Sequence, residues 1–334
     1  MKQTAADVKT APPGFSQDQI REFVKNGFLV VNNAIPRADL QRYLEALDKV
    51  TAEVGSLTAR DRRIYGPSLA ASDGYPGGSA GEAFLHIEGL AGLSGVFAEL
   101  IDHERHIGYI YDIFGQMTKL HISEAFIRPG NTGRNPWHVD GPRMVPFSAF
   151  AGDLPLQIRI GYWLTDLPHE SMGNLVILPG SHRRPYFAAA DTDESIPGER
   201  VVTLQSGAMT IMHGSVWHRV DANTSPVTRK NIYIGYCPSW VTPGEQTVKT
   251  VDWVRGLSRE KRIILRHYEH PYDYSKPPVE DTPLYLDRPT DPYPWRFPYP
   301  AELSFHRRKQ PTFLERFLAS ERRGDGADQL SGCI

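Results

Sequence analysis

The sequence predicts a mainly β protein with flanking helices, and two observations support this prediction. From about residue 117 to 240, short runs rich in valine, isoleucine, threonine and aromatic residues alternate with glycine and proline. Such punctuation is typical of an antiparallel sandwich or barrel. The N-terminal part carries amphipathic helical patterns, which can supply a layer that covers the sheet. With 334 residues, of which 40% are hydrophobic, the chain can bury a sizeable core.

The first predicted helix covers residues 16–27, SQDQIREFVKNG. Ser16 is a favourable N-cap, and Gln19 three residues later completes a capping box. Gly27 can adopt the left-handed conformation that ends a helix. These local signals fix both ends of the helix.

A short strand is predicted over residues 28–35 and a second amphipathic helix over residues 37–50. Residues 55–80 are rich in glycine, serine and proline and predict a loop, which at this length usually has a function. This loop and the proline- and aromatic-rich stretch 268–300 are two candidates for a lid over a site. The alternative for both is plain packing over the core.

One catalytic domain is predicted over residues 1–334. Its predicted parts are a flexible lead-in (1–14), the sheet core with its N-terminal helices (15–245), a C-terminal extension packed on the core with a helix at about 246–266 (246–320), and a disordered tail (321–334).

Composition excludes several classes of protein. The formal net charge of −2 gives no general attraction for nucleic acid. No run approaches the roughly 20 apolar residues that cross a membrane, and no secretory signal is evident. Only two cysteines are present, Cys237 and Cys333, which argues against a disulfide scaffold or a cysteine-rich metal site. We therefore expect a cytoplasmic protein.

The run RNPWHVDGPR contains a candidate metal-binding pair, His138 and Asp140. On an extended segment, side chains two residues apart point to the same side. A third ligand is available on the strand-like run 208–220, which offers His213 and His218. Two histidines and one carboxylate leave three coordination positions open, which suits a non-haem Fe(II) that binds a co-substrate and dioxygen.

If the co-substrate is 2-oxoglutarate, its far carboxylate needs a cation, and the planar fork of arginine suits it best. Arg229 lies eleven residues beyond His218, at the start of the next predicted strand. A short hairpin would return that strand beside the one that carries His218. From the residues alone, His213, sixteen residues before Arg229, also stays a candidate for the third ligand.

Residues 15–240 resemble the phytanoyl-CoA dioxygenase family of Fe(II)- and 2-oxoglutarate-dependent oxygenases. Four blocks in the same order carry the resemblance: SQDQIREFVKNGFLVVNNAIP, WHVD, YWLTDLPHESMGNLVILPGSHR and GAMTIMHGSVWHRVDANTSPVTRKNIYIGY. The family fold is a cupin-like double-stranded β-helix, or jelly roll. The resemblance implies that His218 is the distal iron-binding histidine, that an asparagine lies near Asn223, and that Arg229 binds 2-oxoglutarate.

The resemblance also bears on weaker candidates. Trp163 lines the co-substrate pocket or simply packs in the core, and Asn135 offers its amide to 2-oxoglutarate or shapes a turn. Val220 occupies a position where some members have a serine that helps to bind the far carboxylate. Asp140 occupies the position where related halogenases have a small residue, which favours oxygenation over halogenation. Arg128 is interpreted as solvated, with the mouth of the substrate site as the alternative.

The sequence thus predicts a dioxygenase in which His138, Asp140 and His218 are the metal-binding and catalytic residues. Its cofactors and co-substrates are Fe(II), 2-oxoglutarate and O2. It would oxidise an unactivated C–H bond of a small molecule, by hydroxylation as the default, in specialised metabolism. The alternative is a cupin-like metal-binding protein or metalloenzyme that does not use 2-oxoglutarate and leaves Arg229 idle.

Overall fold

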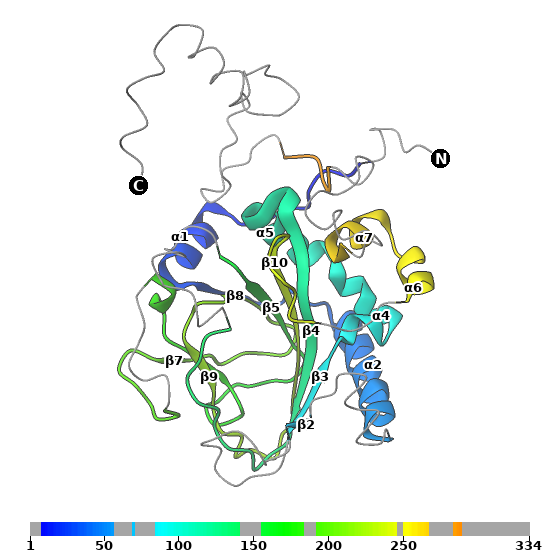
Figure 1. The fold of residues 1–334 in the computed structure, drawn as a ribbon. Coiled ribbons are helices and arrows are strands. Elements are labelled where there is room, and N and C mark those ends of the chain that lie inside the picture. The colour runs from blue at the N-terminus through cyan, green and yellow to red at the C-terminus, as the bar shows by residue number, and fades with distance from the viewer. Residues whose placement is uncertain are drawn as a thin grey trace, which may run out of the picture. The chain divides into compact units, whose positions relative to one another are not determined.

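The computed structural model describes residues 8–56, 69–70, 84–140, 155–183, 192–245, 250–266 and 283–288 (Figure 1). All of them belong to one compact unit, Met1–Trp295, and the second unit, Arg296–Ile334, lies outside the described residues. The predicted lid segments 55–80 and 268–300 lie almost entirely outside them, as does the predicted tail.

Helix α1 (Gln17–Asn26) begins and ends as the sequence predicts. The Ser16 side chain accepts a hydrogen bond from the backbone of Gln19, whose side chain bonds back to Ser16, so the capping box is complete. Gly27 ends the helix with a φ of 70°, a left-handed conformation that glycine adopts without steric cost. Ile20 and Phe23 are buried.

The remaining N-terminal elements are more numerous than the sequence indicates. Strand β1 (Phe28–Val31) is shorter than predicted and helix α2 (Arg37–Ser56) is longer. The stretch that follows carried no predicted element, but it forms β2 (Leu69–Ala70), β3 (Phe84–Glu88), α4 (Gly95–Ala98) and α5 (Glu104–Phe114), with short 3-10 turns at Leu90–Gly92, Glu99–Ile101 and Gly115–Met117.

The predicted run of strands is confirmed. The strands are β4 (Thr118–Arg128), β5 (Ile158–Trp163), β6 (Leu175–Ile177), β7 (Arg200–Val201), β8 (Met209–His213), β9 (His218–Val220) and β10 (Arg229–Pro238). They form a seven-stranded sheet in the order β1-β8-β5-β10-β4-β3-β2 and a three-stranded sheet in the order β7-β6-β9. Every strand pair is antiparallel, as expected for a jelly roll.

Strand β5 shows how the two faces of the large sheet differ. Ile158, Ile160 and Tyr162 point to a core shared with the helices, whereas Trp163 belongs to a second core between the two sheets. Because side chains alternate along a strand, Arg159 shares the inner face with Trp163. In Figure 1, helices α2, α4, α5 and α7 lie on one side of the large sheet, and β7 and β9 lie on the other.

Two predictions need correction. The helix predicted at about 246–266 is interrupted at Gly256 and consists of α6 (Val251–Arg255) and α7 (Arg259–Leu265). Part of the lead-in predicted as flexible is anchored: the N–H of Ala11 bonds to the carbonyl of Leu286, whose N–H bonds to Lys9. Backbone pairing with this distant segment fixes the chain there.

No helix among the described residues is long and apolar enough to cross a membrane.

Candidate metal centre

Backbone pairing brings the three predicted metal ligands together. The segment that carries His138 runs antiparallel to β9, and His138 lies directly opposite His218. The two residues exchange N–H···O bonds of 2.9 and 3.0 Å. Directly opposed residues of an antiparallel pair point to the same face. Asp140 lies two residues further, and its N–H donates to the carbonyl of Gly214 at 3.0 Å.

The ligand atoms of His138, Asp140 and His218 all lie within 4.8 Å of one another. His138 Nε2 is 3.9 Å from Asp140 Oδ1, and His218 Nε2 is 3.6 Å from Asp140 Oδ2. Within the described parts of the chain, this is the one cluster of three or more histidine, cysteine or acidic residues that could hold a metal.

Hydrogen bonds at the other ring nitrogens orient both imidazoles. Nδ1 of His138 lies 2.9 Å from the carbonyl of Pro136, and Nδ1 of His218 lies 2.9 Å from that of Val216. A carbonyl only accepts, so Nδ1 carries the proton and the lone pair remains on Nε2. Both Nε2 atoms therefore face the carboxylate and could act as metal donors.

Burial sets the charge of this cluster. It lowers the pKa of His218 from 6.5 to about 4, despite the nearby Asp140 carboxylate, which raises it. Burial alone would raise the pKa of Asp140, but the guanidinium of Arg159 and the two histidines bring it below its ordinary value. The imidazoles of His138 and His218 and the Asp140 carboxylate form a donor set that fits Fe(II) with open coordination positions.

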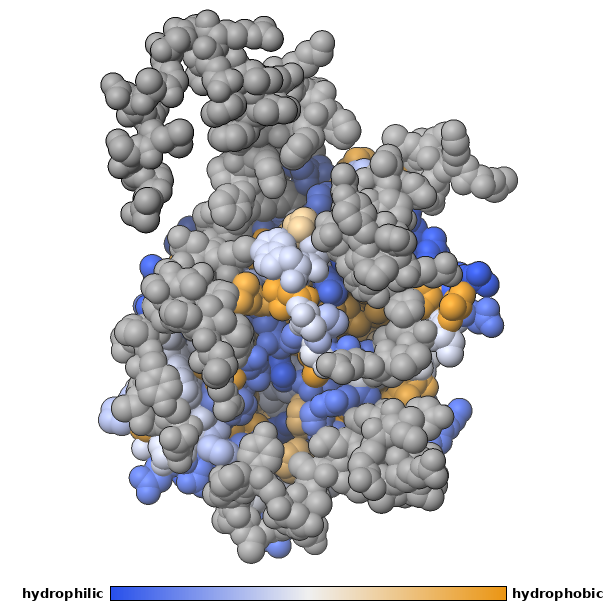
Figure 2. Space-filling model, in the orientation of Figure 1, coloured by the Kyte–Doolittle hydropathy of each residue, from blue (hydrophilic) through white to orange (hydrophobic). Residues whose placement is uncertain are grey.

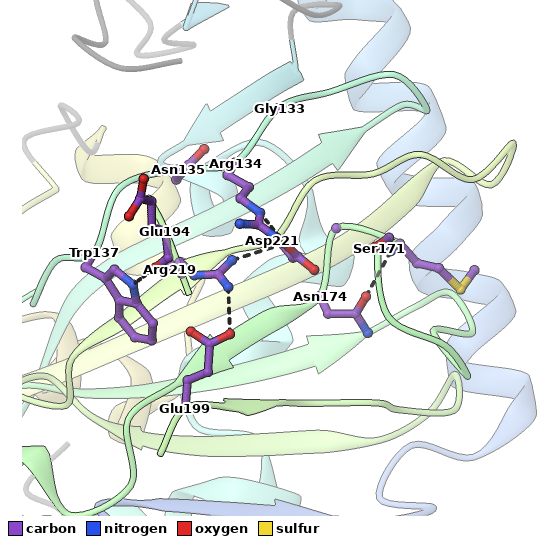
Figure 3. A network of polar contacts seen from close by, with 12 residues as sticks. Gly133, Arg134, Asn135, Trp137, Ser171, Asn174, Glu194, Glu199, Arg219 and Asp221 are labelled. Atoms are coloured by element: carbon purple, nitrogen blue, oxygen red, sulfur yellow. Dashed lines mark hydrogen bonds and ion pairs between the residues drawn. The ribbon is translucent and has the colours of Figure 1, made fainter. Parts of the chain in front are cut away.

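A buried polar network fastens the ligand-bearing segment to β9 (Figure 3). Arg219 on β9 contacts Asp221 at 3.1 Å and Glu199 at 3.0 Å, and its guanidinium lies 5.3 Å from the ring centroid of Trp137. Arg134 reaches the same Asp221 oxygen at 2.9 Å. These contacts fix the strand register on which the opposition of His138 and His218 depends.

His213, the competing third ligand, does not join this cluster. It follows Met209 and Ile211 on the face of β8 that packs toward the helices. Its Nδ1 accepts the N–H of Ser215 at 3.0 Å, and its ring lies 5.0 Å from that of His182. Burial lowers its pKa from 6.5 to about 3, so it is a neutral core residue.

His213 makes folding stability pH-dependent. An unfolded histidine binds its proton near pH 6.5, whereas folded His213 does so only near 3. The unfolded chain therefore binds more protons between these values. The part of the free energy of unfolding that is linked to His213 is therefore fully present above pH 6.5. It is lost as the pH falls, by up to about 1.4 kcal/mol per pH unit. Urea titrations from pH 7.5 to 4.5 should show a weaker pH dependence in His213→Gln than in wild type. An unchanged slope in His213→Gln would contradict this.

Arg229 opens β10 and is 1% exposed. One guanidinium nitrogen donates to the carbonyl of Gly173, and its guanidinium carbon lies 5.4 Å from the ring centroid of Trp163. Trp163 is in turn fixed by a 3.0 Å bond from Nε1 to Thr210. The predicted co-substrate residues Arg229 and Trp163 are thus in contact, and burial lowers the pKa of Arg229 to about 10.

Arg128 lies directly opposite Arg229 in the register of β4 and β10. It is 3% exposed, so the interpretation as a solvated arginine is wrong. Both arginine stems flank Gly173: a Cβ on that residue would lie 3.3 Å from Arg128 Cδ and 3.4 Å from Arg229 Cδ. Burial and the neighbouring Arg229 lower the pKa of Arg128 to about 9. No carboxylate of the described residues forms an ion pair with either guanidinium, so this pair of cations can receive an anion.

The predicted amide of Asn135 is engaged by the protein. Its Oδ1 accepts a 3.1 Å hydrogen bond from Arg128, whose Nε donates to Thr132 at 3.0 Å. Asn223, expected from the family pattern, donates to the carbonyls of Arg128, Pro129 and Val227. Both asparagines therefore hold the surroundings of Arg128.

Two inner-face residues were not predicted from the sequence. Asn231 is fully buried, and among the described residues neither its amide oxygen nor its amide nitrogen has a hydrogen-bond partner. It lies opposite Trp163 in the register of β10 and β5. Arg159 on β5 reaches Asp140 at 2.8 Å. The sequence held a signal for both residues. Asn231 lies two residues after Arg229, and Arg159 lies four residues before Trp163, so each shares a strand face with a predicted site residue.

Fold and site together define a non-haem oxygenase of the jelly-roll class. The sequence profile described as phytanoyl-CoA dioxygenase (PhyH) matches residues 23–231. The chain belongs to this family, as predicted, and is an Fe(II)- and 2-oxoglutarate-dependent dioxygenase by class.

Individual relatives are distant. The ectoine dioxygenase of Streptomyces coelicolor is 22% identical over 67% of this chain and 78% of its own length. HygX from Streptomyces hygroscopicus, solved with nickel, 2-oxoglutarate and hygromycin B, superposes with a TM-score of 0.54 at 18% identity over 72% of this chain and 94% of its own. EctD from S. alaskensis, solved with 2-oxoglutarate and 5-hydroxyectoine, gives 0.54 at 17% identity over 72% and 86% of the two chains. These likenesses confirm the predicted jelly-roll fold.

Proposed function

We propose that His138, Asp140 and His218 hold the catalytic Fe(II), and that Arg229 binds the far carboxylate of 2-oxoglutarate. The observation that carries this proposal is the convergence of two lone-pair-bearing Nε2 atoms and one carboxylate within 4.8 Å. When bound, the iron supplies the oxidative chemistry that uses 2-oxoglutarate and O2 to oxidise a C–H bond. The protein positions the reactants and excludes water.

Strand β10 guides the co-substrate from Arg229 toward the metal. Its inner-face residues Arg229, Asn231 and Tyr233 follow one another at steps of about 7 Å. Arg229 pairs with the far carboxylate, and Arg128 supplies a second donor where Val220 replaces the family serine. Asn231, whose amide has no partner among the described residues, lies on this face between Arg229 and Tyr233, and Tyr233 contacts Arg159 beside Asp140. Trp163 covers the guanidinium of Arg229, which keeps water out and strengthens the charge pairing.

The substrate that we propose is a small, polar molecule. Figure 2 shows a hydrophilic recess near the centre of the face that is drawn. Beside the metal ligands, the inner sheet face carries polar side chains: Arg159 contacts Asp140, and Glu124 contacts Arg159. The solved relatives hold hygromycin B and 5-hydroxyectoine, which are small molecules. With Asp140 in the carboxylate position, hydroxylation is the default outcome, in specialised metabolism and in the cytoplasm, by one catalytic domain.

Succinate release tests this function. Purified protein with Fe(II), 2-oxoglutarate and oxygen is screened across classes of polar metabolites, and each positive product is weighed by mass spectrometry. We expect substrate-stimulated succinate release and a product that has gained one oxygen. A protein that binds iron but neither consumes nor binds 2-oxoglutarate would contradict the proposal and support the cupin-like alternative, in which Arg229 is idle.

Replacing Arg128 tests the second cation of the co-substrate pocket. Arg128→Met should weaken 2-oxoglutarate binding about 10- to 100-fold, the range for losing one or two hydrogen bonds to a charged group. Arg128→Lys keeps the charge and should lose less. The measurement is a calorimetric titration of the metal-loaded protein with 2-oxoglutarate. An affinity for 2-oxoglutarate unchanged in a folded Arg128→Met protein would show that Arg229 acts alone.

A further inference from the structure

The proposed function gives Arg159 no role toward the metal, although this partly buried arginine contacts the predicted carboxylate ligand. Its Nε lies 2.8 Å from Asp140 Oδ2 in an ion pair, although the angle is not that of a hydrogen bond. It projects from β5 into the space between the two sheets, and its side chain is only 15% exposed. Its guanidinium carbon also lies 5.6 Å from the ring centroid of Tyr233.

A second carboxylate fixes the other side of this guanidinium. Arg159 donates from a terminal nitrogen to Glu124 Oε1, and Glu124 Oε2 lies 2.8 Å from His86 Nε2. The His86 ring stacks on Phe126 at 4.3 Å with an interplanar angle of 9°. Strands β3, β4 and β5 thus contribute one member each to a chain that ends at the metal ligand.

We propose that Arg159 is a positioning residue that keeps Asp140 a one-oxygen metal ligand, and that Glu124 and His86 hold Arg159 in place. This inference rests on the proposed function. Because Oδ2 is in an ion pair with Arg159, we assign Oδ1, which lies 3.9 Å from His138 Nε2, as the donor toward the metal. A carboxylate that turned both oxygens to the metal would occupy one more coordination position, and the co-substrate and dioxygen need all three that the triad leaves open.

Charge explains why Glu124 belongs to this arrangement. A lone guanidinium beside the metal ligands would repel a divalent cation, and it does so more strongly in a dry site. The Glu124 carboxylate offsets the charge of Arg159 while its second oxygen remains fixed by His86. Arg159 can therefore orient Asp140 without placing an uncompensated positive charge near the metal.

Anaerobic titrations of the intact protein test this inference. Wild type loaded with Fe(II) should form a visible charge-transfer band as 2-oxoglutarate is added. In Arg159→Met the band should weaken and 2-oxoglutarate affinity should fall. Turnover should fall roughly 10- to 100-fold, as is usual when an outer partner of a metal ligand is lost. Fe(II) should still bind, because all three ligands remain. Arg159→Lys should recover part of the band, and Glu124→Gln should show the same loss to a smaller extent.

A matched control removes another buried arginine. Arg259 on α7 donates to the carbonyls of Pro283 and Leu284, and Arg259→Met should lower the melting temperature without changing the band. The inference is overturned if Arg159→Met keeps the wild-type band and affinity, or if Arg159→Lys is no better than Arg159→Met. If wild type itself forms no band, the proposed function fails and this inference fails with it.

Discussion

Alanine at Asp140 or His218 is expected to abolish turnover. Either change removes one of three donors that lie within 4.8 Å of one another, and two donors hold Fe(II) too weakly to keep it in a defined geometry. The loss of activity should exceed about 100-fold, because that is the upper range for losing merely an outer partner of a metal ligand. The measurements are iron content after gel filtration and succinate release.

Two histidine variants serve as controls for this loss. His169→Ala removes an exposed histidine, and His213→Gln changes the competing candidate that the fold turns toward the helices. Both should retain iron and turnover. Loss of iron in His213→Gln together with its retention in His218→Ala would reverse the assignment of the third ligand.

Replacing Arg229 by methionine is expected to raise the dissociation constant of 2-oxoglutarate by at least about 100-fold. This lies within the range for truncating one partner of a buried charged pair. The effect should be larger than for Arg128→Met, because the guanidinium of Arg229 is the one that lies against Trp163. Iron content should not change, since the three metal ligands are untouched.

Arg200→Leu is the matched control for Arg229→Met, because Arg200 is exposed on β7. It should bind 2-oxoglutarate like wild type. A titration in which Arg229→Met and Arg200→Leu have equal affinity for 2-oxoglutarate would exclude Arg229 from the co-substrate pocket.

The sequence alone was sufficient to predict those features of the fold whose signals lie within a few residues of one another. The capping box of Ser16 and the glycine at Gly27 fixed the ends of α1. The two-residue spacing of His138 and Asp140 predicted that their side chains face the same side, and both lie close to His218 on β9. These signals need only backbone periodicity over a few residues. The preference for His218 over His213 came from the family resemblance.

The surroundings of the site could not be predicted in this way. Arg128 meets Arg229, and Arg159 meets Asp140 and Glu124, through the register of strands far apart in the chain. An arginine is usually exposed, so composition favours the wrong environment for both. The strand face of two residues could have been found: Asn231 lies two residues after Arg229 on β10, and Arg159 lies four residues before Trp163 on β5. The partners of Arg159 could not.

The central claim is that one site holds Fe(II) and 2-oxoglutarate together. The most direct test is an anaerobic titration of the Fe(II)-loaded wild-type protein with 2-oxoglutarate, followed by visible absorption. The account predicts a weak metal-to-ligand charge-transfer band that saturates with 2-oxoglutarate, is absent in His218→Ala, and requires much more 2-oxoglutarate in Arg229→Met. A wild-type protein that binds Fe(II) without forming the band, or a band that persists unchanged in His218→Ala, would contradict it.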